Sequence, residues 1–198
     1  MASLESIRFA QAQETAAAPS PEIAVRGAWR RLDALCEEAP TRAQWDCREG
    51  CGACCRLQVF VHPHEADAIV TALRERYAAH ELAALTRRVA ETAEAGAALD
   101  PGGWRRARLM CAFLDERERC RIYAFRPLKC RAHASREVAA CEDVTASVPL
   151  DDWLVKAAEA VLHGLGDTAP REELHAAVAA RLDSQAVPRR DYGAGSST

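Results

Sequence analysis

Eight of the nine cysteines in this 198-residue chain fall between positions 47 and 141, and four of them stand within nine residues, in CREGCGACCR. Thiolates are soft donors, suited to zinc, copper(I) and iron–sulfur clusters. A Cys-x2-Cys or Cys-x3-Cys turn also brings two sulfurs within chelating distance. The spacing therefore predicts a cysteine-ligated metal centre, with these candidate ligands: Cys47, Cys51, Cys54, Cys55, Cys111, Cys120, Cys130 and Cys141.

The interpretation of clustered thiols depends on whether the protein lies in a reducing compartment, and the first residues favour one. The first 22 residues lack a basic region followed by an apolar one, so we expect no export signal and a cytoplasmic location. Cytosolic thiols stay reduced, and a cluster of them indicates metal or redox chemistry more often than disulfides. No apolar stretch is long enough to span a bilayer. The formal net charge of −3 does not favour nucleic acid or an acidic membrane, so we expect a protein partner of unknown identity.

The pattern of apolar residues predicts one domain with two unstructured ends. Residues 1–20 are rich in Ala, Gln, Ser and Pro and are expected to be disordered. Residues 21–186 are expected to form a single cysteine-cluster domain, with its signature at 47–141. Residues 187–198 are expected to be a flexible tail.

Helical spacing dominates the domain, which predicts a mostly α fold with a small β element beside a cysteine-rich metal-binding loop. Apolar residues three and four apart predict helices that begin at Pro21 and Pro63 and helices over 80–94, 150–164 and 170–183. LQVFV (57–61) predicts a short strand. RLMCAFLD and CRIYAF, joined by a charged turn, predict a small hairpin.

The ninth cysteine, Cys36, lies on the apolar face of the first predicted helix, together with Trp29 and Leu32. Free cysteine is often fully buried and behaves as a small hydrophobic residue. We therefore expect Cys36 to lie outside the metal centre.

The adjacent pair Cys54-Cys55 limits how the ligands can be shared. Neighbouring side chains are expected to diverge, so both sulfurs can rarely serve one tetrahedral zinc without strain. Three arrangements remain open. The thiols could form two four-ligand sites, or one cluster and one zinc site, or some of them could contact the ligands without binding the metal themselves.

Basic residues gather around the later cysteines and allow two interpretations. They either stabilise an anionic thiolate centre or simply solvate the face of the hairpin. The residues concerned are Arg105, Arg106, Arg108, Arg121, Arg126, Lys129 and Arg131.

CREGCGACCR, CAFLDERERCRIYAFRPLKCR and the later Cys141 together resemble the YkgJ-type cysteine-cluster family. Its members are described as zinc- or iron-chelating domains with a CxxCxxCC-like signature. The resemblance covers about half the chain, and the first spacing here has one residue more than the signature. It implies that the seven cysteines from Cys47 to Cys130 are ligands, with Cys141 mapping less securely.

These observations favour an iron–sulfur protein of redox, sensing or assembly type, with [4Fe–4S] the commonest all-cysteine cluster. A zinc domain with a structural or interaction role is the alternative. Protein-lysine methylation follows only by analogy with a flagellin lysine N-methylase that has a similar cysteine signature. The spacing of Cys47, Cys51 and Cys54 also occurs in radical S-adenosylmethionine enzymes, but the chain is too short for their barrel.

Histidines near the cysteines do not make a catalytic site. His62 and His64 flank Pro63 at a predicted helix start, where capping is the expected role. His133 follows Cys130 by three residues and is the best histidine candidate for a ligand, although a surface role is favoured. No Ser or carboxylate is spaced to complete a triad, so we predict no catalytic residue.

Overall fold

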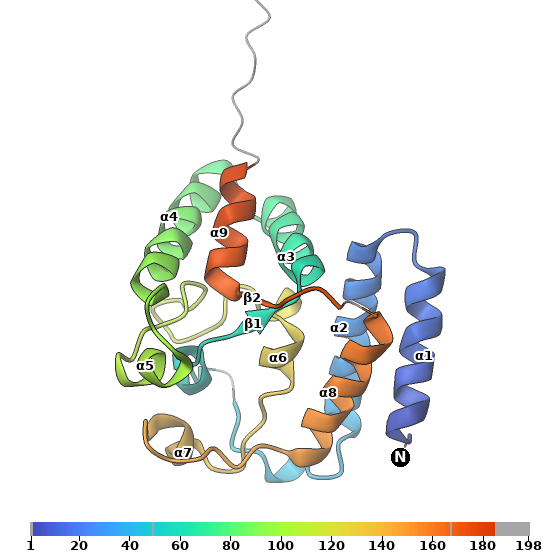
Figure 1. The fold of residues 1–198 in the computed structure, drawn as a ribbon. Coiled ribbons are helices and arrows are strands. Elements are labelled where there is room, and N and C mark those ends of the chain that lie inside the picture. Colours follow the sequence, from blue (N-terminus) through green and yellow to red (C-terminus); the bar gives the residue numbers. More distant parts are fainter. Residues whose placement is uncertain (1, 49, 167, 185–198) are drawn as a thin grey trace, which may run out of the picture.

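The computed structural model describes residues 2–48, 50–166 and 168–184. Within them the chain is mostly helical, with a small two-stranded antiparallel sheet, which confirms the predicted fold class (Figure 1). The predicted tail at 187–198 lies outside the described residues. The longer helices are α1 (Leu4–Ala17), α2 (Pro21–Glu38), α3 (Pro63–Arg76), α4 (Ala79–Gly96), α8 (Asp152–Leu165) and α9 (Leu174–Ser184). The short ones are α5 (Pro101–Arg106), α6 (Leu128–Arg131) and α7 (Val138–Glu142), with 3-10 turns η1 (Arg42–Gln44), η2 (Ala53–Arg56) and η3 (Tyr123–Phe125).

The five helices predicted from apolar spacing are present, but the one predicted at 170–183 begins only at Leu174, because Glu172–Glu173 form strand β2. In the others, capping residues and prolines explain where the helix begins. Pro21 and Pro63 open α2 and α3, because proline lacks the N–H that a first helical turn leaves unpaired. The Ser20 hydroxyl caps α2 by accepting from the Ile23 N–H, and the Asp151 carboxylate caps α8 in the same way.

The prediction that residues 1–20 are disordered is wrong, because α1 packs against α2 and α8. Its buried face consists mainly of Ile7 and Gln11, which are 3% and 0% exposed, so large apolar residues do not mark it. A Cβ added at Gly164 of α8 would lie 2.7 Å from the backbone oxygen of Arg8. The two helices thus meet at a glycine, and close backbone approach replaces a hydrophobic stripe.

The sheet joins two segments that lie far apart in the sequence. Strand β1 (Phe60–Val61) pairs antiparallel with β2 (Glu172–Glu173), and the Leu174 N–H donates to the Val59 carbonyl at 2.8 Å. The predicted strand at 57–61 is therefore shorter than expected. This pairing places α9, which follows β2, beside β1, the strand that comes after the cysteine loop (Figure 1).

The predicted hairpin is reduced to a tight antiparallel turn with an isolated bridge between Leu114 and Cys120. The Asp115 carboxylate accepts the N–H groups of Arg117 and Arg119, and Glu118 has a φ of 57°. These local bonds close the turn and replace a longer ladder.

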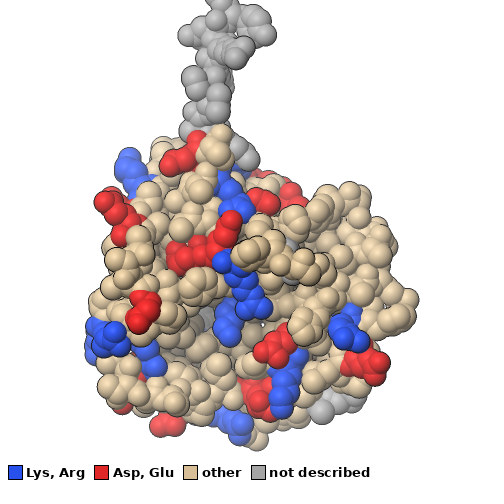
Figure 2. Space-filling view, viewed as in Figure 1, with Lys and Arg blue, Asp and Glu red and all other residues tan. Residues whose placement is uncertain are grey.

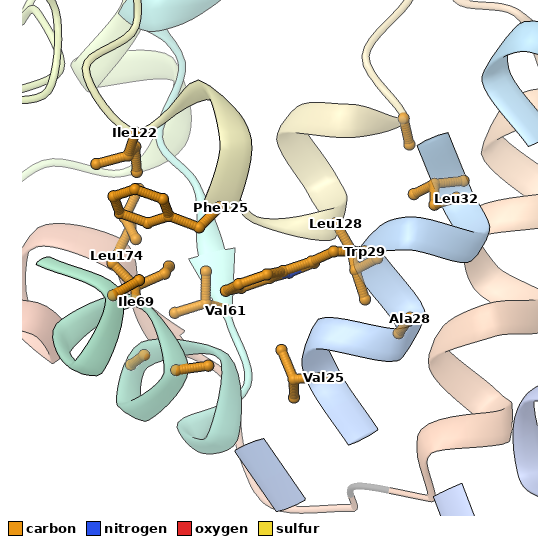
Figure 3. Packing of buried hydrophobic residues seen from close by; sticks show 14 of the residues in the cluster. Val25, Ala28, Trp29, Leu32, Val61, Ile69, Ile122, Phe125, Leu128 and Leu174 are labelled. Atoms are coloured by element: carbon orange, nitrogen blue, oxygen red, sulfur yellow. The ribbon is translucent and has the colours of Figure 1, made fainter. Parts of the chain in front are cut away.

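A continuous core links the helices on both sides of the sheet. Figure 3 shows Trp29 reaching from α2 toward Val61 of β1, while Phe125 lies near Ile69 of α3 and Leu174 of α9. Trp29, Val61 and Ile69 are 4%, 0% and 0% exposed. The core therefore holds the cysteine segments against a rigid helical frame.

The helices of the described residues include none that is both long and apolar enough to cross a membrane. On the face drawn in Figure 2, basic and acidic side chains are interspersed over the surface.

Candidate metal centre

The first four cysteines lie in a loop whose glycines are required by its geometry. Gly50 has a φ of +79°, a conformation that side chains rarely adopt, and it precedes Cys51. A Cβ at Gly52 would lie 3.1 Å from a methyl group of Leu114, so the loop approaches the Cys111–Cys120 turn closely at this point. The chain then forms η2, which carries both Cys54 and Cys55.

Backbone hydrogen bonds join this loop to the later cysteine segments. The Cys111 N–H donates to the Cys55 carbonyl at 2.8 Å, and the Asp46 N–H donates to the Ser135 carbonyl at 2.9 Å. The Ser135 N–H in turn donates to the Cys47 sulfur at 3.3 Å. The segments around Cys111 and Ser135 are therefore both hydrogen bonded to the loop.

Cys130 is positioned by α6, which is anchored to α3 by a buried carboxylate. Glu65, 2% exposed, accepts the Leu128 N–H at 2.9 Å and the His62 N–H at 3.4 Å. Burial raises the pKa of Glu65, and the two backbone N–H groups act against that shift. The N-terminus of α6 is thus fixed by one side chain from the helical frame.

Cys141 is held through Arg105 of α5, which clamps the segment around α7. Its guanidinium donates to the carbonyls of Ala140 at 2.9 Å, Ala146 at 2.8 Å and Asp143. A charged donor that satisfies the carbonyls at the end of a short helix acts as a C-terminal cap. The position of Cys141 therefore depends on Arg105.

The thiols affect one another's pKa, and we sort them into two groups by which neighbouring charges contribute to each shift, with Cys54 contributing to both. Burial raises the pKa of Cys47, and the charges of Cys54 and Cys51 raise it further against the Ser135 N–H. Burial also raises the pKa of Cys141, with added contributions from Cys47, Cys54 and Cys51. We call these four residues the first group: Cys47, Cys51, Cys54 and Cys141.

The second group surrounds Cys111. Burial raises the pKa of Cys120 to about 11, and the Cys111 charge adds to the effect. Burial raises the pKa of Cys130 well above the ordinary thiol value, with Cys111, Cys54 and Cys120 all contributing. The pKa of Cys55 is raised by Cys54, by burial, and by the charges of Cys111 and Cys130. The second group is therefore Cys55, Cys111, Cys120 and Cys130, and Cys54 acts on both groups.

Cys54 and Cys55, the pair expected to diverge, shift each other's pKa. Interaction with the Cys55 side chain lowers the pKa of Cys54 to about 7, and the pKa of Cys55 is raised in turn. Both residues lie in the 3-10 turn η2, which directs consecutive side chains about 120° apart, so the expected divergence stays a prediction.

Cys36 lies in the hydrophobic core, where its thiol contacts the Arg131 carbonyl at 3.7 Å. Burial raises its pKa to about 11, and the charged groups that affect it most are Arg126 and Asp33 rather than cysteines. The structure thus places Cys36 among core residues, apart from both groups.

Most of the basic residues near the cysteines have structural partners. Arg121 pairs with Glu116, and buried Arg131 pairs with Asp33 and donates to backbone carbonyls. The Arg126 guanidinium stacks on the Tyr123 ring, 3.7 Å from its centroid, and its charge also lowers the pKa of Cys54, Cys120 and Cys130. It is the cation best placed to offset negative charge on the thiolates.

A histidine that sequence reasoning did not select, His175, contacts the second group. It is 1% exposed on α9, and its Nε2 lies 3.3 Å from the Cys111 sulfur. Its Nδ1 lies 2.9 Å from Oε1 of Glu173, and the Ala112 N–H donates to Nε2 at 3.2 Å. Burial favours the neutral ring, but Cys111 and Glu173 raise the pKa of His175 to about 9. The surroundings of Nε2 therefore favour a positive charge.

The three histidines considered from the sequence take other roles. His62 is the N-cap residue of α3, as expected, and its Nε2 accepts from Arg171 at 3.2 Å. His64 lies 3.8 Å from Asp67. His133 is half-buried, and burial lowers its pKa to about 4, with the charges of Lys129 and Arg105 adding to the effect.

The thiols are neighbours but do not form a closed coordination shell. Across residues 2–48, 50–166 and 168–184, no three Cys, His, Asp or Glu side chains are arranged to hold a metal ion as they stand. None of the nine cysteines forms a disulfide. The donor set nevertheless fits a thiophilic metal, because eight soft sulfurs lie in connected segments and a bound cation would favour the thiolate form that ligation requires.

Comparison with known proteins identifies the family. The family with the signature CxxCxxCC, described as "Putative zinc- or iron-chelating domain", matches residues 46–148, slightly more than half of the chain. No curated protein and no solved structure matches the sequence. The match spans all eight cysteines of the two groups, and it supports metal binding through them. The chain therefore belongs to the CxxCxxCC family of zinc- or iron-chelating domains.

Proposed function

We propose that this protein binds an iron–sulfur cluster through its grouped cysteines and serves in redox, sensing or assembly chemistry. The observation that supports the proposal best is the number of thiols that act on one another. A structural zinc ion takes four ligands, and eight thiols in two adjoining groups exceed the need of one such ion. Iron–sulfur clusters are commonly held by four cysteine thiolates, so either group has the size that a cluster needs.

The residues of this chain would hold and tune such a centre in separate ways. The thiolates supply the ligands, the Ser135 N–H donates to the Cys47 sulfur, and Arg126 offsets negative charge around the second group. The cluster itself would supply one-electron transfer.

The test is anaerobic purification followed by metal analysis, sulfide analysis and visible spectroscopy. A brown protein with iron and acid-labile sulfide supports the proposal. A colourless protein with stoichiometric zinc refutes it in favour of a zinc domain.

Two cysteine variants provide the matched comparison. Cys130→Ser should lose the visible absorbance, because Cys130 belongs to the second group. Cys36→Ser should keep it, because Cys36 lies in the hydrophobic core.

A further inference from the structure

The environment of His175 has features that an ordinary core histidine does not need. The ring is stacked between Trp104 and Phe113, with ring centroids 5.6 and 5.8 Å away and interplanar angles of 21° and 19°. Both aromatic residues are fully buried. The imidazole is therefore fixed in orientation by three separate elements, α5, the turn after Cys111 and α9.

The hydrogen bonds determine which nitrogen faces the cysteines. The Ala112 N–H lies 3.2 Å from Nε2, and Nδ1 lies 2.9 Å from the Glu173 carboxylate. A neutral ring with its proton on Nδ1 would direct that proton at Glu173 and leave the lone pair of Nε2 beside Cys111, and a bound metal ion would favour this neutral form. Glu173 is only 13% exposed, and its second oxygen accepts the Ala176 N–H at 2.9 Å. A histidine with one nitrogen bonded to a carboxylate and the other presented to a thiol has the arrangement of a metal-binding histidine.

We propose that His175 is a nitrogen ligand of the metal centre, binding through Nε2 beside Cys111. The inference rests on the proposed metal-binding function and adds a residue from outside the family match at 46–148. Two ligands bound to one tetrahedral metal, at about 2.05 Å for nitrogen and 2.3 Å for sulfur, lie roughly 3.5 Å apart. The observed separation of Nε2 and the Cys111 sulfur is 3.3 Å. On metal binding, the ion takes the place of the contacts that Nε2 now makes.

Cadmium provides a test that does not depend on the native metal. The full-length chain, freed of metal and labelled with 15N-histidine, is loaded with 113Cd²⁺ and studied by 113Cd NMR. One cadmium resonance should show scalar coupling to the His175 nitrogen, and its chemical shift should indicate a mixed sulfur and nitrogen site. In His175→Ala this coupling should disappear, and in His175→Cys cadmium should return with an all-sulfur shift.

Two further variants separate ligation from a packing role. Glu173→Gln leaves His175 in place but replaces the carboxylate beside its Nδ1 with a neutral amide. We expect about a 10- to 100-fold loss of cadmium affinity. Leu182→Ala removes a buried side chain from the same helix, at its far end from His175, and should lower stability without changing the NMR signals. Cadmium bound with no nitrogen coupling in the wild-type chain would overturn this inference alone. A chain that takes up no cadmium would also overturn this inference, whereas the proposed function fails separately if the anaerobically purified protein contains no iron and no acid-labile sulfide.

Discussion

Arg105 offers a direct way to learn whether the segment that carries Cys141 belongs to the metal centre. Its guanidinium donates to three backbone carbonyls around α7, whereas the neighbouring Arg106 is exposed and pairs with Asp100 at 3.8 Å. Hydrogen bonds from charged donors contribute about 1.5–3 kcal/mol each when buried. Arg105 is partly exposed and water can reach the freed carbonyls, so we expect Arg105→Met to lower the free energy of unfolding by about 2–3 kcal/mol in total. Arg106→Met should cost less than about 0.5 kcal/mol.

Urea unfolding of the reduced, metal-free chain, followed by far-ultraviolet circular dichroism, measures the stability difference between the two variants. Competition with a chelator then measures metal affinity, which should fall roughly 10- to 100-fold in Arg105→Met, since 1.4 kcal/mol corresponds to a factor of ten. Equal stability of the two variants would show that the hydrogen bonds from Arg105 do not hold the segment around α7. A large stability loss with unchanged metal affinity would instead remove Cys141 from the ligand set.

Three other outcomes can be checked with the same preparations. Cys55→Ser should reduce metal per folded chain in elemental analysis because Cys55 lies in the second group, and unchanged metal would contradict that placement. Deleting residues 1–19 should lower the free energy of unfolding by at least about 2 kcal/mol, because the core loses the buried side chain of Ile7. Metal content should stay constant. Raising the pH above 9 should destabilise the metal-free chain in thermal unfolding. Burial raises the pKa of Cys120 from 9.0 to about 11, so the unfolded chain releases this proton first, and the associated stability is lost as the pH rises through this range. A flat pH profile between 9 and 11 would count against the buried thiols.

The parts of the fold that sequence reasoning predicted well are those in which local pattern and burial agree. In α2, the apolar spacing of Val25, Trp29 and Leu32 coincides with the buried face of the observed helix. In α1 that agreement fails, because Gln11 is fully buried and a glycine on α8 makes room for it. A polar side chain in a helix interface leaves no hydrophobic period to detect.

The candidate site was predicted as far as its cysteines, and His175 was missed for a topological reason. It stands 34 residues beyond Cys141 in the sequence, and it reaches Cys111 because β2 pairs with β1. Long-range strand pairing of two residues per strand gives almost no sequence signal.

The antiparallel pairing of Val61 with Glu172 also affects the order of events during synthesis. The ribosome produces the cysteine loop and β1 more than 100 residues before β2 and α9. Until then β1 lacks its hydrogen-bonded neighbour, and the thiols emerge without the C-terminal helix that later covers Cys111. Contacts between such distant segments also form slowly. The nascent chain therefore exposes a soft metal-binding loop for most of its translation, and we expect correct metal loading to follow release of the finished chain.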